Sequence, residues 1–188
     1  MKLRRLTLAL LLALSPVATV AQAVPAPAAT AVTASTAHAS WWAEQRWRYR
    51  DDAAAEEAYR ALTVRQSAWP EWHQVHVVWL PRGTRMQIAL SPGQPVDHPG
   101  AFATFDVIPD TAWVRRVLAV KVAWKPAVDR VVTYEVAEPL PADTGTVGPQ
   151  IDEVGPTYLP GGGSQLEIMA VAADRMRYLK VVEVRPIR

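Results

Sequence analysis

The chain has 188 residues, of which 50% are apolar, with 20 basic and 18 acidic side chains, 16 prolines and no cysteine. It is too apolar for a chain that is disordered throughout, too short for several domains, and it cannot form disulfides or cysteine metal sites. The formal net charge of +2 would by itself suggest a nucleic-acid binder, but the positions of the basic residues argue against that.

The first residues have the pattern of an export signal. Residues 1–5 contain three basic side chains, residues 6–14 are almost entirely apolar, and residues 21–23 (Ala-Gln-Ala) fit a signal-peptidase site. Cleavage after Ala23 removes three basic residues and leaves a mature chain of net charge −1, so we expect no nucleic-acid partner. No apolar run is long enough to span a membrane, so we expect no membrane span after cleavage. The export signal itself predicts a secreted or periplasmic location.

The mature chain begins with a segment of low complexity. Residues 24–40 are almost entirely Ala, Pro, Thr, Val and Ser, which favours a flexible tether. A single globular domain is then expected over residues 41–188. It starts with a Trp-, Arg- and Ala-rich stretch, residues 41–62, that lacks Gly and Pro and predicts one long helix.

Short strands follow this helix. Residues 84–90 alternate, with Met86, Ile88 and Leu90 expected on one face and Arg85 and Gln87 on the other. Strand-like runs are also expected at residues 73–80, 101–107, 117–124, 130–137, 165–171 and 178–185, with an irregular stretch at 139–163. One helix followed by about seven strands predicts an α+β fold, with an N-terminal helix and a small, mostly antiparallel sheet core.

Several kinds of catalytic site are excluded by spacing. The four histidines show no metal-ligand pattern, so we expect no metal. No Gly-x-Ser-x-Gly motif and no cysteine nucleophile occurs, and the only glycine cluster lacks the spacing of a phosphate-binding loop.

That glycine cluster, Gly161-Gly162-Gly163, directly precedes Ser164 and Gln165. Glycines allow close backbone approach, and they can direct the next residues of a strand into a cleft. A neutral amide there could bind a ribose hydroxyl or position a water. The alternative is a glycine loop that only turns a corner between strands.

A family resemblance adds to this interpretation. Five motifs occur in order along residues 78–169: Leu80-Pro81-Arg82-Gly83-Thr84, Gly100-Ala101-Phe102, Arg116-Val117-Leu118, the Thr133–Pro141 run with Gly145, and Pro160 to Gln165. In these motifs and their order, the chain resembles the tuberculosis necrotizing toxin domain family of NAD glycohydrolases.

The resemblance implies an ADP-ribosyltransferase-like fold and cleavage of NAD to nicotinamide and ADP-ribose, with NAD as substrate and no separate cofactor. It implies Gln165 as the catalytic residue, Phe102 beside the nicotinamide and Arg116 on the diphosphate, with Arg85 as a second cation. Gly162, Gly163 and Ser164 are expected to contribute to NAD binding, and a cognate immunity protein is a candidate partner.

Two family positions differ in this chain. The family has an arginine shortly after the Leu-Pro-x-Gly-Thr motif, and this chain has Ile88 there. The family also has a histidine before the Thr-Tyr strand, at a position that corresponds to the surroundings of Val128 in this chain. Each missing polar contact to a transition state can reduce the rate substantially. The alternatives are therefore a catalytically inactive binding module of the same fold, or an envelope interaction protein whose partner surface is the Trp- and Arg-rich helix.

Overall fold

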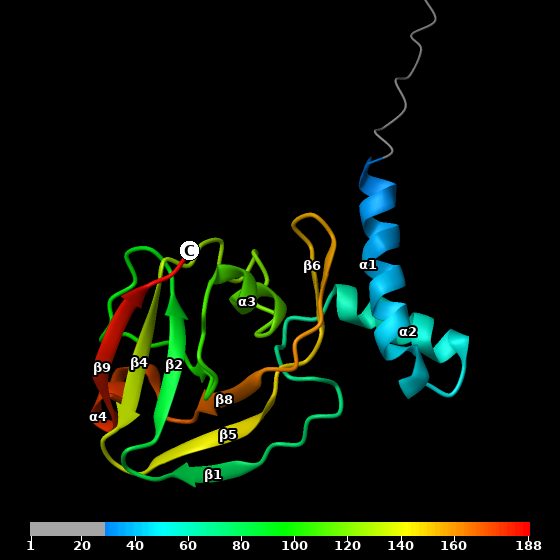
Figure 1. Cartoon of the computed structure of the whole chain (residues 1–188). Coiled ribbons are helices and arrows are strands. Elements are labelled where there is room, and N and C mark those ends of the chain that lie inside the picture. Colours follow the sequence, from blue (N-terminus) through cyan, green and yellow to red (C-terminus); the bar gives the residue numbers. More distant parts are fainter. Residues whose placement is uncertain (1–28) are drawn as a thin grey trace, which may run out of the picture.

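A computed structural model describes residues 29–188 of the chain. The expected export signal, residues 1–23, and residues 24–28 of the expected tether lie outside this range. The described chain begins with helices and continues into antiparallel sheets, as Figure 1 shows. Every strand pair in it is antiparallel, which confirms the α+β class with a mostly antiparallel sheet core.

The helical stretch differs from the single helix that we expected over residues 41–62. The structure has α1 (Ala29–Gln45), a 3-10 turn (Arg46–Arg48) and α2 (Asp52–Thr63). The backbone is extended at Tyr49 and at Asp51, and the Asp51 carboxylate accepts from the Ala54 amide at 2.8 Å. An aspartate N-cap of this kind starts a new helix, so the prediction of one continuous helix is wrong.

The segment expected as a tether also differs over residues 29–40, which form the first part of α1. Its alanines have high helix propensity. Ala37 is buried, and the His38 ring lies 2.9 Å from the Glu56 carboxylate of α2 and makes an edge contact with Tyr59. These contacts supply the packing that composition alone did not reveal.

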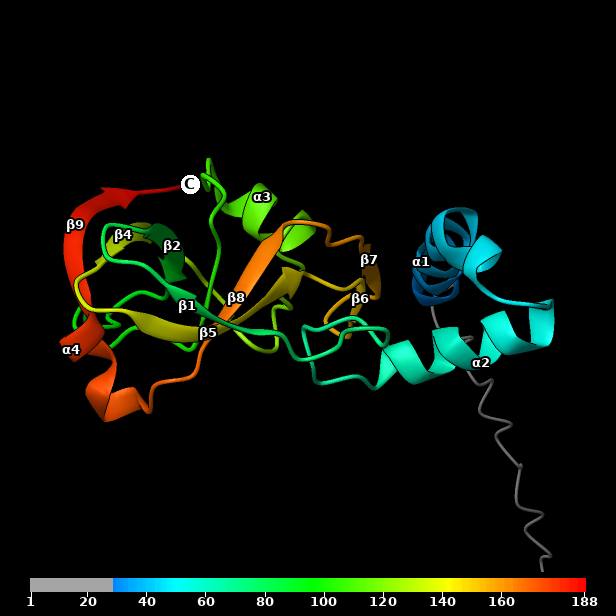
Figure 2. The same ribbon diagram turned by 90° about the horizontal axis from the view of Figure 1, so that it is seen from below.

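The two helices pack on one end of the molecule. Trp41 is fully buried in a cluster with Ala55, Leu62 and Ile151. Ile151 lies in the hairpin of β6 (Gln150–Asp152) and β7 (Thr157–Leu159), which Figure 2 shows between the helices and the larger sheets. The hairpin thus connects the helical end to the body of the domain.

The body contains two larger sheets. One has the order β1 (Val77–Leu80), β5 (Leu140–Thr146), β8 (Ser164–Ile168) and β3 (Phe102–Ala103). The other has the order β2 (Arg85–Leu90), β4 (Arg130–Val136) and β9 (Leu179–Pro186). The expected strands on either side of the Pro81–Gly83 turn are present, but they pair with β5 and β4 and not with each other.

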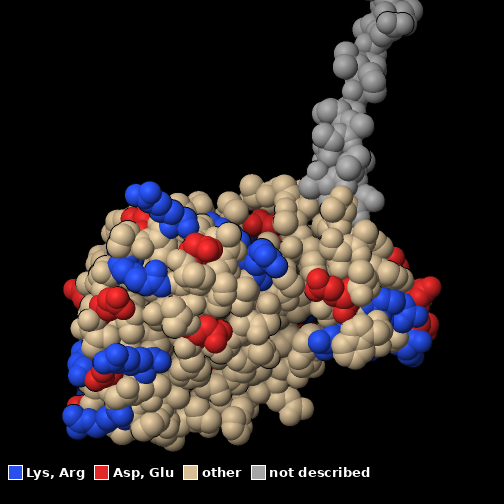
Figure 3. Space-filling model, viewed as in Figure 1, with Lys and Arg blue, Asp and Glu red and all other residues tan. Residues whose placement is uncertain are grey.

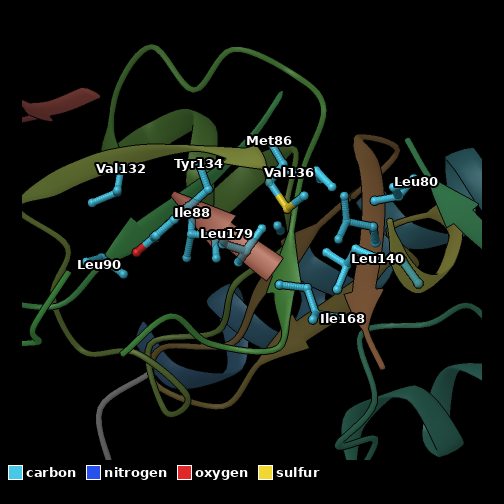
Figure 4. Packing of buried hydrophobic residues seen from close by; sticks show 13 residues of the cluster. Leu80, Met86, Ile88, Leu90, Val132, Tyr134, Val136, Leu140, Ile168 and Leu179 are labelled. Carbon is cyan, nitrogen blue, oxygen red and sulfur yellow. The ribbon is translucent and has the colours of Figure 1, made fainter. Parts of the chain in front are cut away.

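The core lies between these two sheets. Met86, Ile88 and Leu90 are buried on one face of β2, as the alternation predicted. They pack with Leu140 and Ile168 of the facing sheet, and Figure 4 shows these side chains converging on one cluster. Burial of such apolar side chains is the main stabilising contribution to a domain of this size.

Two segments differ from the sequence predictions. Residues 117–124, expected as a strand, are turns that follow α3 (Thr111–Arg116), a helix capped by the Asp110 carboxylate, which accepts from the Trp113 amide at 2.7 Å. Residues 139–163, expected to be irregular, contain β5, β6 and β7. A second 3-10 turn (Ala172–Asp174) and the short α4 (Arg175–Tyr178) then lead into β9.

Charged side chains of both signs alternate over the surface that Figure 3 shows. This face carries no extended basic field of the kind that attracts a phosphate backbone. From residue 29 onward, no helix has the length and hydropathy that crossing a membrane requires.

Candidate functional site

A cavity of about 230 Å³ lies where β2, β3 and β8 meet α3 and the turns that follow it. Its walls are mostly small aliphatic residues, with Phe102 and Trp124 as aromatic members. The polar side chains in the wall belong to Gln87, Lys125 and Gln165. Because a dry cavity of about 150 Å³ holds a benzene ring, this cavity is large enough for one aromatic ring and the groups next to it, but not for a whole dinucleotide.

Gln165 is aimed by the glycine loop before it. The Gly161 amide donates to the Arg116 carbonyl at 2.9 Å, and the Gly163 amide donates to the Val117 carbonyl at 3.1 Å. A Cβ on Gly163 would lie 2.9 Å from the Val117 side chain, so only glycine allows the loop to pack this closely on the end of α3. The loop thereby fixes where β8 starts, and hence where Gln165 points.

The Gln165 amide is the least satisfied polar group of the cavity. The residue is 4% exposed, and its Nε2 has no hydrogen-bond partner among the residues that the structure describes. A buried donor without a partner costs about 1–3 kcal/mol. A ligand oxygen that accepted from this amide would recover that cost.

Phe102 lines the same cavity from β3 and is 44% exposed. Part of its side chain is therefore accessible to a ligand. The structure thus brings Gln165 and Phe102, both singled out from the sequence, to one cavity.

The other loop residues are bonded within the protein. The Gly162 amide donates to the Val147 carbonyl at 3.0 Å, and the Ser164 amide donates to the Asp106 carboxylate at 2.7 Å. Ser164 Oγ lies 2.9 Å from Thr104 Oγ1 and accepts from the Phe105 amide. Gly162, Gly163 and Ser164 do not line the cavity, and their contacts hold the loop and β8 in place.

The two candidate arginines do not line the cavity either. Arg116, the last residue of α3, has an exposed side chain. Arg85 is two residues before Gln87 of the cavity wall, but its guanidinium binds the Glu135 carboxylate at 3.2 Å and is 68% exposed. Neither cation is therefore in contact with the Gln165 side of the cavity.

A cation that the sequence did not single out is in the wall. The Lys125 ammonium donates to the Ala89 carbonyl of β2 at 2.6 Å. Burial lowers the pKa of Lys125, and the nearby positive charge of Arg115 lowers it further. The sequence offered one hint, because Lys121 lies within the otherwise apolar run of residues 117–124 and Lys125 directly follows it. The prediction of a strand for that run did not place Lys125 in the site.

Phe102 is supported by a second aromatic layer. The Trp69 ring packs edge-on against Phe102, with centroids 6.2 Å apart, and stacks on the His73 ring at 3.9 Å. Trp69 Nε1 donates to the Glu167 carboxylate at 3.1 Å, and His73 Nε2 lies 2.8 Å from Asp143 Oδ2. Since these residues come from β5, β8 and the segment before β1, sequence spacing could not reveal the group.

Asp143 in this group is buried. Burial opposes its ionisation, but hydrogen bonds from the His73 ring and from the His76 backbone amide outweigh it, so the pKa of Asp143 lies below its ordinary value. The carboxylate is therefore charged at neutral pH and orients the His73 ring beneath Trp69.

The geometry defines an α+β domain with a ring-sized apolar cavity that carries a buried amide. The chain matches no protein-family model and no curated protein sequence. It is similar in structure to Tne2, solved in complex with Tni2, with a TM-score of 0.51 and 27% identity over 64% of this chain and all of Tne2.

Two further solved structures are similar to the chain. Tse6, in complex with Tsi6, gives a TM-score of 0.41 with 17% identity over 84% of this chain and 99% of Tse6. Rhs1-CT, in complex with its cognate immunity protein RhsI1, gives a TM-score of 0.37 with 15% identity over 62% of this chain and 82% of Rhs1-CT. All three of these proteins were solved bound to a second protein.

Proposed function

We propose that this protein is a toxin-type NAD glycohydrolase, which binds NAD at the cavity and releases nicotinamide and ADP-ribose. The observation that carries the proposal is the buried Gln165 Nε2, which has no hydrogen-bond partner in the described part of the chain and lies in the same cavity as the half-exposed Phe102. The ordered motifs of residues 78–169 and the similarity to Tne2 support it.

The chemistry requires few groups. The N-glycosidic bond breaks, its electron pair goes to the ring nitrogen of the cationic nicotinamide, and the ribose carbon acquires oxocarbenium character. A water molecule then adds its oxygen to that carbon and loses a proton. Stabilisation of the developing charge and orientation of the sugar are what a protein can contribute to such a step.

The residues of the cavity fit these roles. Phe102 would stack on the nicotinamide ring, and Trp69 behind it would hold the Phe102 ring in place. Gln165 Nε2 would donate to a ribose hydroxyl and orient the sugar for attack. The aliphatic walls would exclude bulk water, which strengthens these hydrogen bonds.

The test is nicotinamide release by purified protein, for the wild type and for Gln165→Leu. We expect release by the wild type and a loss of about 100-fold or more in the variant, because an oriented donor to a transition state contributes about that much. Gln74→Leu is the matched control, since Gln74 is exposed and lies outside the cavity. Equal rates for wild type and Gln165→Leu would contradict the assigned role.

One alternative is a binding module of the same fold that has no hydrolase activity. It is favoured because Arg116 is exposed and Arg85 is paired with Glu135, so neither arginine is in the cavity. A module of this kind would bind NAD in calorimetry without releasing nicotinamide. If the wild type neither binds nor cleaves NAD, both functions fail.

The complex of Tne2 with Tni2 supports a partner for this chain as well. We propose a dedicated inhibitor protein, as Tne2 was solved with Tni2. A protein that stops nicotinamide release at a one-to-one ratio would meet this expectation, and one that binds the chain without affecting release would not.

A further inference from the structure

We propose that Lys125 binds the diphosphate of the dinucleotide substrate. The inference rests on the proposed function for the identity of the substrate, but the anion site itself can be tested without any turnover. It assigns to Lys125 the role for which the sequence favoured Arg116 and Arg85.

The first support is position. Among the described residues, Lys125 is the only charged side chain in the cavity wall. Its ammonium has three N–H donors, of which one reaches the Ala89 carbonyl at 2.6 Å. No carboxylate of the described chain lies within ion-pair distance of it, whereas the exposed Lys180 is paired with Glu135 at 2.6 Å. Lys125 is therefore a half-buried cation with donors free for an anion.

The second support is that the cation is held in place. Arg115 of α3 donates to the Val120 carbonyl at 2.8 Å and to the Lys125 carbonyl at 2.7 Å. These bonds fix both ends of the turn that carries Lys125 to the helix. Because the ammonium is itself bonded to the Ala89 carbonyl, the side chain loses little additional conformational entropy when it binds an anion.

The third support is the arrangement of charge around the cavity. Lys125 contacts β2, whereas Gln165 and Phe102 belong to β8 and β3. The cation is thus bonded to a different strand from those that carry the two side chains assigned to the sugar and to the positively charged ring. An anion on the β2 wall would neutralise an ammonium that lies among aliphatic side chains, where charge interactions are stronger than in water. A diphosphate supplies that anion without bringing the nicotinamide next to the lysine.

The experiment compares three probes by calorimetry: ADP-ribose, inorganic pyrophosphate and nicotinamide. We expect Lys125→Gln, which keeps a donor for Ala89 but removes the charge, to weaken ADP-ribose and pyrophosphate binding roughly tenfold to a hundredfold. Lys125→Arg should stay within about threefold of the wild type because it retains a cation. Nicotinamide affinity should be unchanged in both variants.

Lys180→Met is the matched control, because this lysine is exposed and does not line the cavity. If Lys125→Gln does not fold, the wild type can be labelled with an amine-reactive reagent in the presence and absence of pyrophosphate. We then expect pyrophosphate to protect Lys125 and not Lys180, as read by peptide mass spectrometry. Equal labelling of Lys125 under both conditions would overturn the proposal.

The outcomes separate this inference from the proposed hydrolase. If the wild type cleaves NAD and Lys125→Gln binds ADP-ribose like the wild type, the inference fails and the hydrolase stands. If ADP-ribose binding is weakened in Arg116→Gln and not in Lys125→Gln, Arg116 is the diphosphate ligand and the inference fails. If ADP-ribose binds through Lys125 but no nicotinamide is released, the inference stands and the hydrolase fails.

Discussion

The buried pair of His73 and Asp143 lies behind the aromatic wall of the cavity. Its two side chains meet at 2.8 Å, and the His73 ring stacks directly on Trp69. Replacing Asp143 by Asn removes the charge but keeps the size of the side chain. We expect Asp143→Asn to lower the free energy of unfolding by about 1–3 kcal/mol at pH 7, since a buried hydrogen bond to a charged group is lost.

The pH dependence of this effect has a definite sign. The pKa of Asp143 is lower in the folded state than in the unfolded state, where it is near 3.8. The stability that the ionised carboxylate contributes is therefore fully present above pH 3.8 and is lost as the pH falls through the pKa of the folded state. The stability difference between wild type and Asp143→Asn should therefore narrow below pH 3.8. Denaturant unfolding at pH 7 and at lower pH measures it.

The matched control is the exposed pair of His98 and Asp97, which has the same 2.8 Å geometry on the surface. Asp97→Asn should change the free energy of unfolding much less than Asp143→Asn does, because solvent screens an exposed pair. An equal loss in Asp97→Asn and Asp143→Asn would contradict the importance of burial.

At the scale of elements, the glycine loop before β8 controls the direction of Gln165. Gly161 and Gly162 both have positive φ, at 73° and 93°. A Cβ on Gly161 would lie 2.7 Å from the carbonyl oxygens of Val147 and Gly148, whereas a Cβ on Gly162 would meet nothing within 4 Å. The two glycines thus share the backbone strain but not the steric clash.

We expect Gly162→Ala to lose about 1–2 kcal/mol of stability from the left-handed backbone alone. Gly161→Ala should lose about 1–3 kcal/mol more, because overpacking against backbone adds to that strain. It should also slow nicotinamide release more than Gly162→Ala does, since a shift of about 1 Å at Gln165 is costly. Thermal or denaturant unfolding and the release assay measure both effects, and equal losses in the two variants would contradict the clash.

The elements also show what the sequence could predict. The strand containing Met86, Ile88 and Leu90 followed from its period of two, because each residue carries that signal locally. β5 was missed because Pro141 and Gly145 mask it, and it is fixed by pairing with β1 and β8 on its two sides. The fold class was therefore predictable from composition and order, whereas β5 depends on tertiary pairing.

The candidate site likewise contains residues that the sequence could predict and residues that depend on tertiary contacts. Gln165 and Phe102 were found because each lies beside a recognisable glycine-containing motif. Lys125 could not be found, since its place in the cavity depends on Arg115 holding the turns after α3. The Trp69 layer behind Phe102 likewise depends on three segments that are distant in the sequence.

At the scale of the whole molecule, the helical end and the cavity are separate structures. Figure 2 shows α1 and α2 at one end and the two larger sheets at the other, and from the described chain only residues from Ala68 onward line the cavity. Changes in α1 should therefore affect the stability of the helical end without changing what the cavity binds.

A truncation tests this separation and also the nature of residues 24–40. A chain that starts at Trp41 loses the buried Ala37 and the contact of His38 with Glu56, so we expect it to be about 1–3 kcal/mol less stable than a chain that starts at Val24. Its affinity for NAD should stay within about twofold, because the cavity wall is intact. A flexible tether would instead leave the stability unchanged, so unfolding curves of the two chains distinguish a packed helix from a tether. A large loss of NAD affinity would show that the helical end and the cavity are coupled.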